Sequence, residues 1–342
     1  MRLFPKSTKE LKWAGLRLLV ALVLIVVVPV AGAFWSASMP GQSHTGSVPA
    51  PATEQTRLQA ALRQHVEELA GTIGVRSRFL GDTLGNSARY IASELAQMGY
   101  TPVLLPYDTE EGEAANVVVE LPGTTAASEI VVVGAHYDTV LTTPGADDNA
   151  SGVAVLLETA RALAGRDFPR TVRFVAFANE EPPYFQTGEM GSLQYARHCR
   201  KAGDDVVAMY SLESLGYFDD EPGSQMYPPP FSLIYPEEGS FVGFVGDLAS
   251  RHLVQRAVRL FRETTPVPSE GLAGPSWIPG VDLSDHWAFW QEDYPALMIT
   301  DTALFRNPHY HKAGDLPSVL DFERMTWVAS GVIRIVEDVA TR

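Results

Sequence analysis

Cysteine is almost absent from this chain, because Cys199 is the only one among 342 residues. A single thiol excludes an intramolecular disulfide and a zinc site built from several thiolates. Any metal ion must therefore be held by His, Asp or Glu. Cys199 lies in Tyr195-Ala-Arg-His-Cys-Arg200, a stretch typical of the end of a helix, so we interpret it as a structural thiol and not as a nucleophile.

Basic residues are also scarce, with 26 Lys and Arg against 41 Asp and Glu, and the formal net charge is −15. A surface this acidic would repel a phosphate backbone, which excludes nucleic acid as a partner. Most of the excess acid is expected on a solvated surface. The 46% hydrophobic and 20% charged composition is that of a globular protein and excludes a largely disordered one.

The N-terminus carries a membrane signal. An uncharged run from Leu18 to Trp35 follows a basic segment that contains Arg2, Lys6, Lys9, Lys12 and Arg17. The run is close to the minimum that crosses a bilayer as a helix, and the basic residues predict a cytoplasmic N-terminus. We therefore expect a short cytoplasmic segment at 1–17 and a single-pass signal anchor at 18–35. The alternative is a signal peptide cleaved near the small residues Ala31-Gly-Ala33 or Ala37-Ser-Met39. Both predict a periplasmic or extracellular domain.

Residues 36–54 are rich in Ser, Gly, Pro, Thr and Ala, and we expect a flexible linker with little that can pack. The catalytic domain should then span 55–342. Strands and helices alternate there, which predicts an α/β protein, a three-layer α/β/α sandwich around a mostly parallel mixed sheet. The strands are expected near 116–121, 130–134, 171–178, 206–212, 240–245 and 294–300, and the helices near 57–70, 87–98, 150–164, 190–200, 251–263 and 321–339.

Residues of the kind that bind metals follow several of these strands. His136 ends an apolar strand, and Asp138 is placed to accept the second N–H of its imidazole. Asp147 and Asp148 lie on a glycine-bounded loop before a helix, where they could also form a plain helix cap. Glu180 and Glu181 are adjacent acids that follow a further buried strand. Their carboxylates should repel each other unless a cation or a raised pKa accommodates them.

Glu213 ends a further apolar strand, and Asn307-Pro-His309-Tyr310-His311 lies near the C-terminus. Sites in such sheets form beyond the carboxyl ends of the strands, which is where these residues fall. Carboxylate and imidazole ligands without thiolate suit a hydrolytic zinc site with open coordination positions.

Together these segments resemble peptidase family M28, the zinc aminopeptidases. The resemblance rests on His136-Tyr-Asp138, Gly145-Ala-Asp147-Asp148-Asn149-Ala-Ser151-Gly152, Asn179-Glu180-Glu181, Glu213 with Gly216, and Tyr310-His311, in the order found in the family. It covers roughly residues 55–342 and implies the fold of the zinc-dependent exopeptidases.

The resemblance also implies roles for individual residues. His136 and Glu213 would hold one Zn²⁺, Glu181 and His311 a second, and Asp148 would bridge the two. Glu180 would be the general base, Tyr310 would stabilise the oxyanion, and Asp138 would support His136 from outside the ligand set. His309 and His286 would be neighbours of the site.

The sequence departs from the family in three places. Many relatives have Asp where this chain has Glu213, which remains a carboxylate. The link after Glu181 is stretched to Pro182–Ser192, and a Pro-rich insertion spans Asp219–Glu238. Both insertions are expected to wall the substrate cleft. Trp277, Trp287 and Phe289 could line the side-chain pocket, although core packing is the ordinary place for such residues.

The function that the resemblance implies is a two-zinc exopeptidase. It would remove N-terminal residues from peptides with a free N-terminus, using a zinc-bridging hydroxide and Glu180. One alternative is a one-zinc aminoacyl cyclotransferase of the glutaminyl-cyclase kind on the same fold, for which the ligand set is larger than needed. Another is a receptor-like ectodomain that has lost its chemistry, which the complete set of ligands and base argues against.

Overall fold

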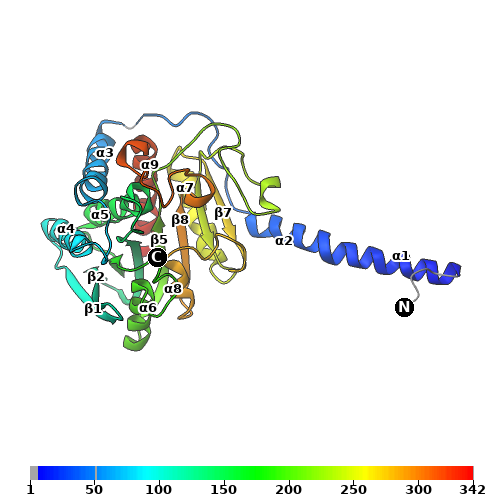
Figure 1. Ribbon diagram of the computed structural model, residues 1–342, viewed down its shortest axis with the longest axis horizontal. Helices are drawn as coiled ribbons and strands as arrows, with labels where there is room; N and C mark the ends of the chain where they lie inside the picture. Colours follow the sequence, from blue (N-terminus) through cyan, green and yellow to red (C-terminus); the bar gives the residue numbers. More distant parts are fainter. Residues whose placement is uncertain (1–6, 51, 342) are drawn as a thin grey trace.

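A mixed eight-stranded sheet forms the centre of the computed structural model, which describes residues 7–50 and 52–341 (Figure 1). The strand order is β1-β2-β4-β3-β5-β8-β6-β7. The strands are β1 (Val103–Thr109), β2 (Gly112–Leu121), β3 (Ala126–His136), β4 (Arg170–Phe177), β5 (Asp205–Glu213), β6 (Val242–Gly246), β7 (Ser269–Ala273) and β8 (Ala296–Thr300).

Parallel pairing holds the middle of the sheet. Strands β4, β3, β5 and β8 run side by side in one direction, and β6 pairs with β7 in parallel. The β1-β2, β2-β4 and β6-β8 pairs are antiparallel. The predicted mostly parallel mixed sheet is confirmed.

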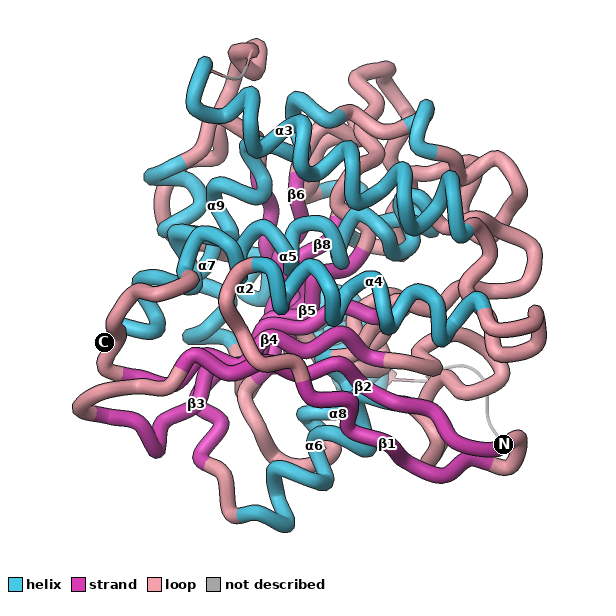
Figure 2. Tube along the Cα trace, turned by 90° about the vertical axis from the view of Figure 1, so that its left-hand side faces the viewer, coloured by secondary structure: helices cyan, strands magenta, loops and turns pink. Residues whose placement is uncertain are grey.

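Helices cover both faces of the sheet, which gives three layers (Figure 2). The helices of the domain are α3 (Thr53–Val66), α4 (Thr83–Gln97), α5 (Gly152–Leu163), α6 (Gly191–Ala202), α7 (Arg251–Thr264), α8 (His286–Trp290) and α9 (Phe322–Thr341). Helices α6 and α8 lie on one face, and the others pack on the opposite face. The predicted α/β/α sandwich is confirmed.

Strand β3 shows why its sequence is a continuous apolar run. Ile130 and Val132 belong to the apolar cluster under α6 and α8, whereas Val131 and Val133 belong to the larger cluster under α5 and α9. Successive side chains of a strand point to opposite faces, so a strand covered on both sides is apolar at every position. Cys199 lies in the first of these clusters, where burial raises the pKa of its thiol to about 12, in agreement with a structural role.

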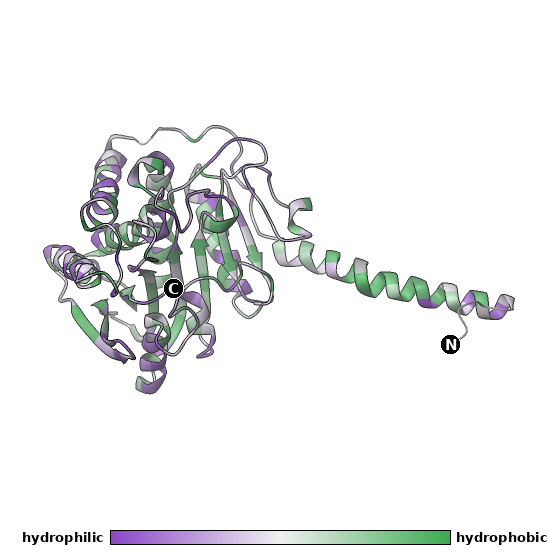
Figure 3. Cartoon of the chain, in the orientation of Figure 1, coloured by the Kyte–Doolittle hydropathy of each residue, from purple (hydrophilic) through white to green (hydrophobic). Residues whose placement is uncertain are grey.

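The N-terminal residues form one long helical run that projects from the domain (Figure 1). It consists of α1 (Thr8–Leu22), a π-helical segment at Val23–Val27 and α2 (Val28–Ala37). The part from Leu11 to Ala37 is long and apolar enough to cross a membrane, with a mean hydropathy of 2.8 over an 18-residue window, a property that signal sequences share (Figure 3). Arg2 and Lys6 of the predicted basic segment lie outside the described residues.

The segment after this helix packs on the domain, so the prediction of little packing between residues 36 and 54 is wrong. Met39 lies against the apolar core beside Gly271, and Arg262 donates hydrogen bonds to the carbonyls of Pro40 and Gly41. Ser43 Oγ accepts a hydrogen bond from the backbone N–H of Ser269. The composition of the segment did not reveal this packing, because most of its hydrogen bonds are made by its backbone carbonyls, which every residue carries.

Candidate active site

Three neighbouring parallel strands end in the candidate active site. His136 is the last residue of β3 and Glu213 is the last residue of β5, while Glu180 and Glu181 follow the end of β4. Because these strands run in the same direction, their carboxyl ends lie on one edge of the sheet. The fold therefore brings side chains that are far apart in the sequence to one place.

His136, Asp148 and Glu213 form the first group of candidate ligands. His136 Nε2 lies 3.2 Å from Asp148 Oδ1 and 3.2 Å from Glu213 Oε2. The three side chains are buried, and their ligand atoms lie within 4.8 Å of one another. One imidazole and two carboxylates facing a common point is a donor set that suits zinc.

Asp148, Glu181 and His311 form the second group. His311 Nε2 lies 3.1 Å from Asp148 Oδ2 and 3.2 Å from Glu181 Oε2. Asp148 therefore turns one oxygen toward each histidine and belongs to both groups. Two metal ions that share one carboxylate need such a residue between them.

The buried atoms of the second group are poorly satisfied by the protein itself. Glu181 Oε1 and His311 Nε2 have no hydrogen-bond partner within the described residues. Burial and the neighbouring Asp148 together raise the pKa of Glu181 to about 8, although His311 opposes the rise. A divalent cation would relieve this crowding of acids, and the nitrogen and oxygen donors fit zinc.

The two imidazoles lie in a strongly negative field. Burial lowers the pKa of His311, but the neighbouring carboxylates of Asp148 and Glu181 outweigh this effect and raise the value to about 10. Burial also opposes protonation of His136, whose pKa nevertheless lies well above its usual value because of Glu213 and Glu180. A field that binds protons this firmly would also bind a metal cation.

Glu180 lies beside the ligands without belonging to either group. Its Oε2 is 4.0 Å from His136 Nε2, and the side chain is buried. Burial raises the pKa of Glu180 well above its usual range; His136 opposes the rise, and the nearby carboxylates of Glu181 and Glu213 add to it. A carboxylate with a raised pKa, close to a metal site, can act as a general base and acid near neutral pH.

Asp138 supports the site from behind. Its carboxylate accepts hydrogen bonds from the backbone N–H groups of Glu180, at 3.0 Å, and of Glu181, at 3.1 Å. Asp138 Oδ1 is 3.6 Å from His136 Nδ1, too long for a hydrogen bond. Asp138 thus faces His136 as expected and also fixes the loop that carries Glu180 and Glu181.

The double-acid loop separates the roles of its two acids. Asp147 turns away from the histidines and accepts hydrogen bonds from the backbone N–H of Gly216 and from the side-chain amide of Asn307, both at 2.9 Å. Of the two acids, only Asp148 faces His136 and His311. This geometry agrees with the expectation that Asp148, and not Asp147, faces the other candidate ligands.

Sequence reasoning missed several residues that position these ligands. Asp315 accepts hydrogen bonds from the backbone N–H groups of Asp147 and Asp148. Ser284 donates a hydrogen bond of 2.8 Å to Glu213 Oε2, the oxygen that faces His136. Asp315 lies four residues after His311, and Ser284 lies two residues before His286, which was expected near the site, but neither position indicates its partner.

Arg76 was missed without any local signal. Its buried guanidinium donates hydrogen bonds to the carbonyls of Tyr137, Pro144 and Gly145, among others, and thereby ties the His136 loop to the double-acid loop. Burial lowers the pKa of Arg76 to about 10, so the side chain stays charged at neutral pH. Only the folded chain shows that so distant a residue holds the site together.

Tyr310 lies at the rim, with its ring stacked on that of His311 at a centroid distance of 3.9 Å. Burial raises the pKa of Tyr310 far above the physiological range, so its O–H is a permanent donor. His309 and His286 lie outside both ligand groups. His309 packs edge-on against Tyr217, and His286 Nε2 lies 2.8 Å from the carbonyl of Val281, to which it donates.

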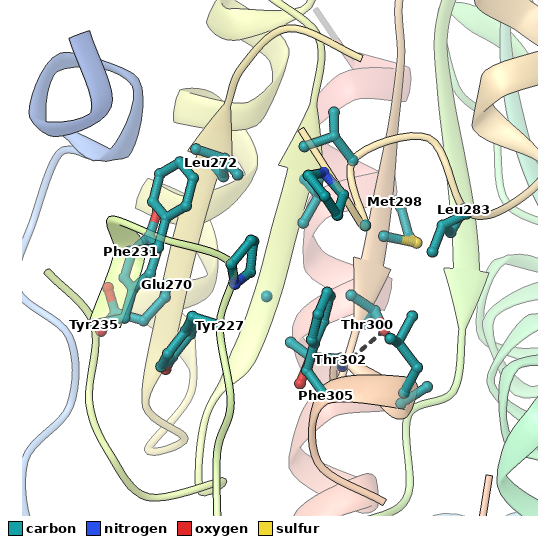
Figure 4. A pocket seen from close by; sticks show the side chains of 18 of the residues that line it. Tyr227, Phe231, Tyr235, Glu270, Leu272, Leu283, Met298, Thr300, Thr302 and Phe305 are labelled. Atoms are coloured by element: carbon teal, nitrogen blue, oxygen red, sulfur yellow. Dashed lines mark hydrogen bonds between the residues drawn. The ribbon is translucent and has the colours of Figure 1, made fainter. Parts of the chain in front are cut away.

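An apolar pocket, whose empty space is about 820 Å³ when its open mouth is included, has Glu213 and Tyr310 among its lining residues. Tyr227, Phe231 and Tyr235 of the Pro-rich insertion form one wall (Figure 4). Strands β6, β7 and β8 and the loops at 278–283 and 302–305 form the rest, with Leu272 and Met298 among the lining side chains. The insertion at 219–238 therefore walls a pocket beside the ligands, as expected.

The other residues proposed for this pocket do not line it. Phe289 is fully buried in the core against Phe177 and Tyr195, Trp287 packs beside that core, and Trp277 is 80% exposed. The insertion at 182–192 contributes no lining residue either. The presence of an aromatic residue in the sequence could not show whether it lines the pocket or packs in the core, because both places favour the same side chains.

Comparison with known proteins gives one family and several similar chains. The family described as "Peptidase family M28" matches residues 116–336. The uncharacterised protein YfbL of Escherichia coli K12 is 38% identical over 296 residues, which cover 84% of this chain and 90% of that protein.

Two solved structures share the fold at low identity. A zinc aminopeptidase of Bacillus subtilis has a TM-score of 0.68 and 14% identity, and the match covers 87% of this chain and 97% of that one. A glutaminyl cyclase of Fimbriiglobus ruber has a TM-score of 0.59 and 16% identity, and the match covers 88% of this chain and 99% of that one. The fold is thus common to a hydrolase and a cyclase, and the choice between them depends on the site.

Proposed function

This chain belongs to peptidase family M28, and from that premise we propose that it is a two-zinc aminopeptidase that hydrolyses the N-terminal bond of peptides. One observation carries the proposal: Asp148 belongs to two groups of ligands at once, with His136 and Glu213 on one side and Glu181 and His311 on the other. A single metal ion would leave one group of buried acids and imidazole without a cation.

The five ligand residues would hold two zinc ions. When bound, these ions would lower the pKa of a water molecule toward neutrality and polarise the scissile carbonyl. Four of the five ligand residues, all except His311, are buried, which limits access of bulk water and strengthens the electrostatic interactions within the site.

Glu180 is the general base in this proposal. It takes a proton from the attacking water and passes it to the nitrogen of the leaving peptide, so that one proton moves and the carboxylate is regenerated. Asp138 supports this role because it accepts the backbone N–H of Glu180 and fixes the start of the side chain. Tyr310 donates its O–H to the oxygen on which negative charge develops.

The apolar pocket would take the side chain of the N-terminal residue. It begins at Glu213 and Tyr310, which would bind and stabilise the reacting group, and its walls are aromatic and aliphatic. We therefore expect a preference for large apolar or aromatic N-terminal residues. The aminopeptidase of the same fold in Bacillus subtilis supports the choice of exopeptidase action.

Membrane anchoring by the N-terminal helix is part of the proposal, with the N-terminus in the cytoplasm and the domain on the other side. The helix end is built into the domain: Ala33 and Ser36 are buried, and Arg251 donates a hydrogen bond to the carbonyl of Trp35. A cleaved signal sequence would not need these contacts. This supports an uncleaved anchor at 18–35 that leads into a peptidase domain at 55–342.

The test uses the full-length protein purified in detergent. Zinc per chain is measured by atomic emission, and hydrolysis is measured on aminoacyl-anilides that differ in the N-terminal residue. About two zinc ions per chain and turnover that a chelator abolishes are expected. Glu180→Gln should keep the metal and lose about 10²–10⁴-fold in kcat.

A glutaminyl peptide distinguishes the runner-up, a cyclotransferase. Cyclisation releases ammonia and leaves every peptide bond intact, whereas hydrolysis releases the N-terminal residue, and mass spectrometry separates the two. The cyclised product together with one zinc per chain would replace the proposal by a glutaminyl-cyclase activity, for which the Fimbriiglobus ruber structure shows that the fold is suitable.

A further inference from the structure

Two loops of the domain surround the end of the N-terminal helix. They are residues 226–235, in the Pro-rich insertion, and residues 275–281, after β7; we call them the anchor loops. Ala33 of α2 is buried in an apolar cluster with Phe231 of the first loop and with Ile278 and Val281 of the second. Figure 1 shows the insertion reaching over the end of α2.

Arg251 fixes the helix end from the side of α7. Its guanidinium lies 4.3 Å from the ring centre of Trp35 and donates to the carbonyls of Trp35 and Ser38. The end of α2 and the domain thus form one packed unit. The direction of the helix across the membrane therefore determines which face of the domain lies toward the bilayer.

The depth of Ala33 follows from the length of the helix. Arg17 is the last charged residue before the apolar run. A hydrocarbon core of about 30 Å needs about 20 helical residues, so a span that starts at Leu18 ends near Ala37. Ala33 lies four residues before that end, which is about 6 Å inside the span. Domain residues that bury Ala33 must then reach the boundary region of the bilayer.

The composition of the anchor loops agrees with this depth. Neither loop contains a charged residue, although 20% of the chain is charged. Leu233 is 73% exposed in the first loop and Trp277 is 80% exposed in the second. An exposed Trp with an apolar ring and a polar N–H is typical of a membrane interface. Contact with lipid would cover the apolar surface that both side chains otherwise expose to water.

We propose that the anchor loops insert into the interface of the same bilayer that the N-terminal helix spans, with Leu233 and Trp277 in contact with lipid. The inference rests on the proposed membrane anchoring and is independent of the proposed peptidase chemistry. Tyr227, Phe231 and Ile278 of these loops also line the apolar pocket, so the wall of the pocket is the part of the domain that touches the membrane. Peptides that partition into the interface would meet the pocket there.

The test places a fluorescent probe at single cysteines in the full-length protein, reconstituted in phosphatidylcholine vesicles. Cys199, the only native cysteine, is replaced by Ala, and an environment-sensitive label is attached at Leu233→Cys or at Trp277→Cys. Lipids that carry a nitroxide near the headgroup serve as quenchers. Both probes should emit at shorter wavelength in vesicles and lose most of their emission to the nitroxide lipids.

Two matched positions make the result decisive. Leu104 is 50% exposed on β1, at the edge of the sheet opposite β7, and its probe should remain unquenched. Leu24 lies in the helical run, and its probe should be quenched by lipids with a deep nitroxide.

Quenching at Leu24 without quenching at Leu233 and Trp277 would overturn the lipid contact and leave the anchor intact. No quenching at Leu24 would overturn the anchor, and the lipid contact with it. Zinc content and anilide hydrolysis of each labelled variant show separately that the domain is folded and whether the peptidase proposal holds.

Discussion

The carboxylate of Asp315 accepts the backbone N–H of Asp148 at 3.2 Å, while its other oxygen accepts the backbone N–H of Asp147 at 2.9 Å. Asp315 approaches from the segment that also carries Tyr310 and His311. A single carboxylate thus ties Asp148, the proposed bridging acid, to the part of the chain that carries His311. Asp315 acts through Asp148 and is a positioning residue.

The substitution Asp315→Asn is expected to weaken the metal site. An amide offers one acceptor oxygen, so its NH₂ group would face a backbone N–H and one buried hydrogen bond would be lost. We expect a loss of about 10–100-fold in zinc affinity, measured by competition with a chromogenic chelator. With saturating zinc, kcat should recover in large part.

Asp167→Asn provides the matched control, because the same change occurs at an exposed position. Its zinc affinity and kcat should equal those of the parent. If Asp315→Asn behaved in the same way as this control, Asp315 would have no positioning role.

Asp148 and Glu213 should differ in how many metal ions they hold. Asp148 belongs to both ligand groups, whereas Glu213 belongs to one. Asp148→Asn should therefore lose most of both zinc ions, and Glu213→Gln should keep about one zinc per chain of the two in the parent. Metal analysis after dialysis against a dilute chelator measures both. Equal losses in the two variants would contradict the bridging role of Asp148.

The residues at the strand ends could be predicted because two local signals coincide there. An apolar run marks β3 and β5, and each ends in a residue of the metal-binding type, His136 or Glu213. The positioning residues carry no such signal. Ser284 is 71 residues from Glu213, to which it donates, and Arg76 lies in an irregular loop. A hydrogen bond between distant segments depends on tertiary structure, which neither periodicity nor spacing encodes.

Two strands of the sheet were also missed, for reasons that differ. Strand β1 contains Pro106, which normally argues against a strand, but β1 lies at the edge of the sheet, where a missing N–H is tolerated. Strand β7 is only five residues long and contains Gly271. The space beside Gly271 is filled by Met39, so the segment expected to be a free linker in fact completes this edge.

The apolar pocket gives a prediction about specificity. Gly243 lines the pocket on β6, and a methyl group there would meet its neighbours only at ordinary contact distance, 3.4 Å from the Thr300 carbonyl oxygen. Gly243→Leu should fill part of the pocket and lower kcat/KM for leucyl and phenylalanyl anilides by about 10–200-fold. The alanyl anilide should lose much less. Gly243→Ala is the control and should change each value only slightly; a uniform loss in Gly243→Leu would point to general damage.

His286 should make the stability of the domain depend on pH. Burial lowers the pKa of this histidine from 6.5 to about 4, and its Nδ1 has no hydrogen-bond partner within the described residues. Below pH 6.5 the unfolded chain binds a proton that the folded chain does not bind, so stability is complete above pH 6.5 and falls as the pH falls toward 4. The loss amounts to about 2 kcal/mol between pH 8 and pH 5.

The variant His286→Phe isolates this effect, because a ring of similar shape remains and the titration is removed. Its stability at pH 8 should be lower than that of the parent, since the hydrogen bond to Val281 is lost. The difference in the free energy of unfolding between parent and variant should be about 2 kcal/mol smaller at pH 5 than at pH 8. Urea unfolding of the zinc-free proteins at both pH values measures this difference. The same difference at both pH values would show that His286 does not titrate as described.

Finally, the segment between the anchor and the domain should contribute to stability. A chain that begins at Ser38 keeps the contacts of Met39, Pro40, Gly41 and Ser43, whereas a chain that begins at Thr53 loses them. Ordering this segment costs conformational entropy, which offsets much of the gain from its hydrogen bonds and from the burial of Met39. We expect the shorter chain to be less stable by about 1–3 kcal/mol. Arg262 would also lose two of its acceptors. It lies 3.6 Å from Glu270, which lines the pocket, so KM for leucyl anilide should rise more than kcat falls. Urea unfolding and anilide kinetics on both chains measure these effects, and identical curves for the two would show that the segment only rests on the domain without stabilising it.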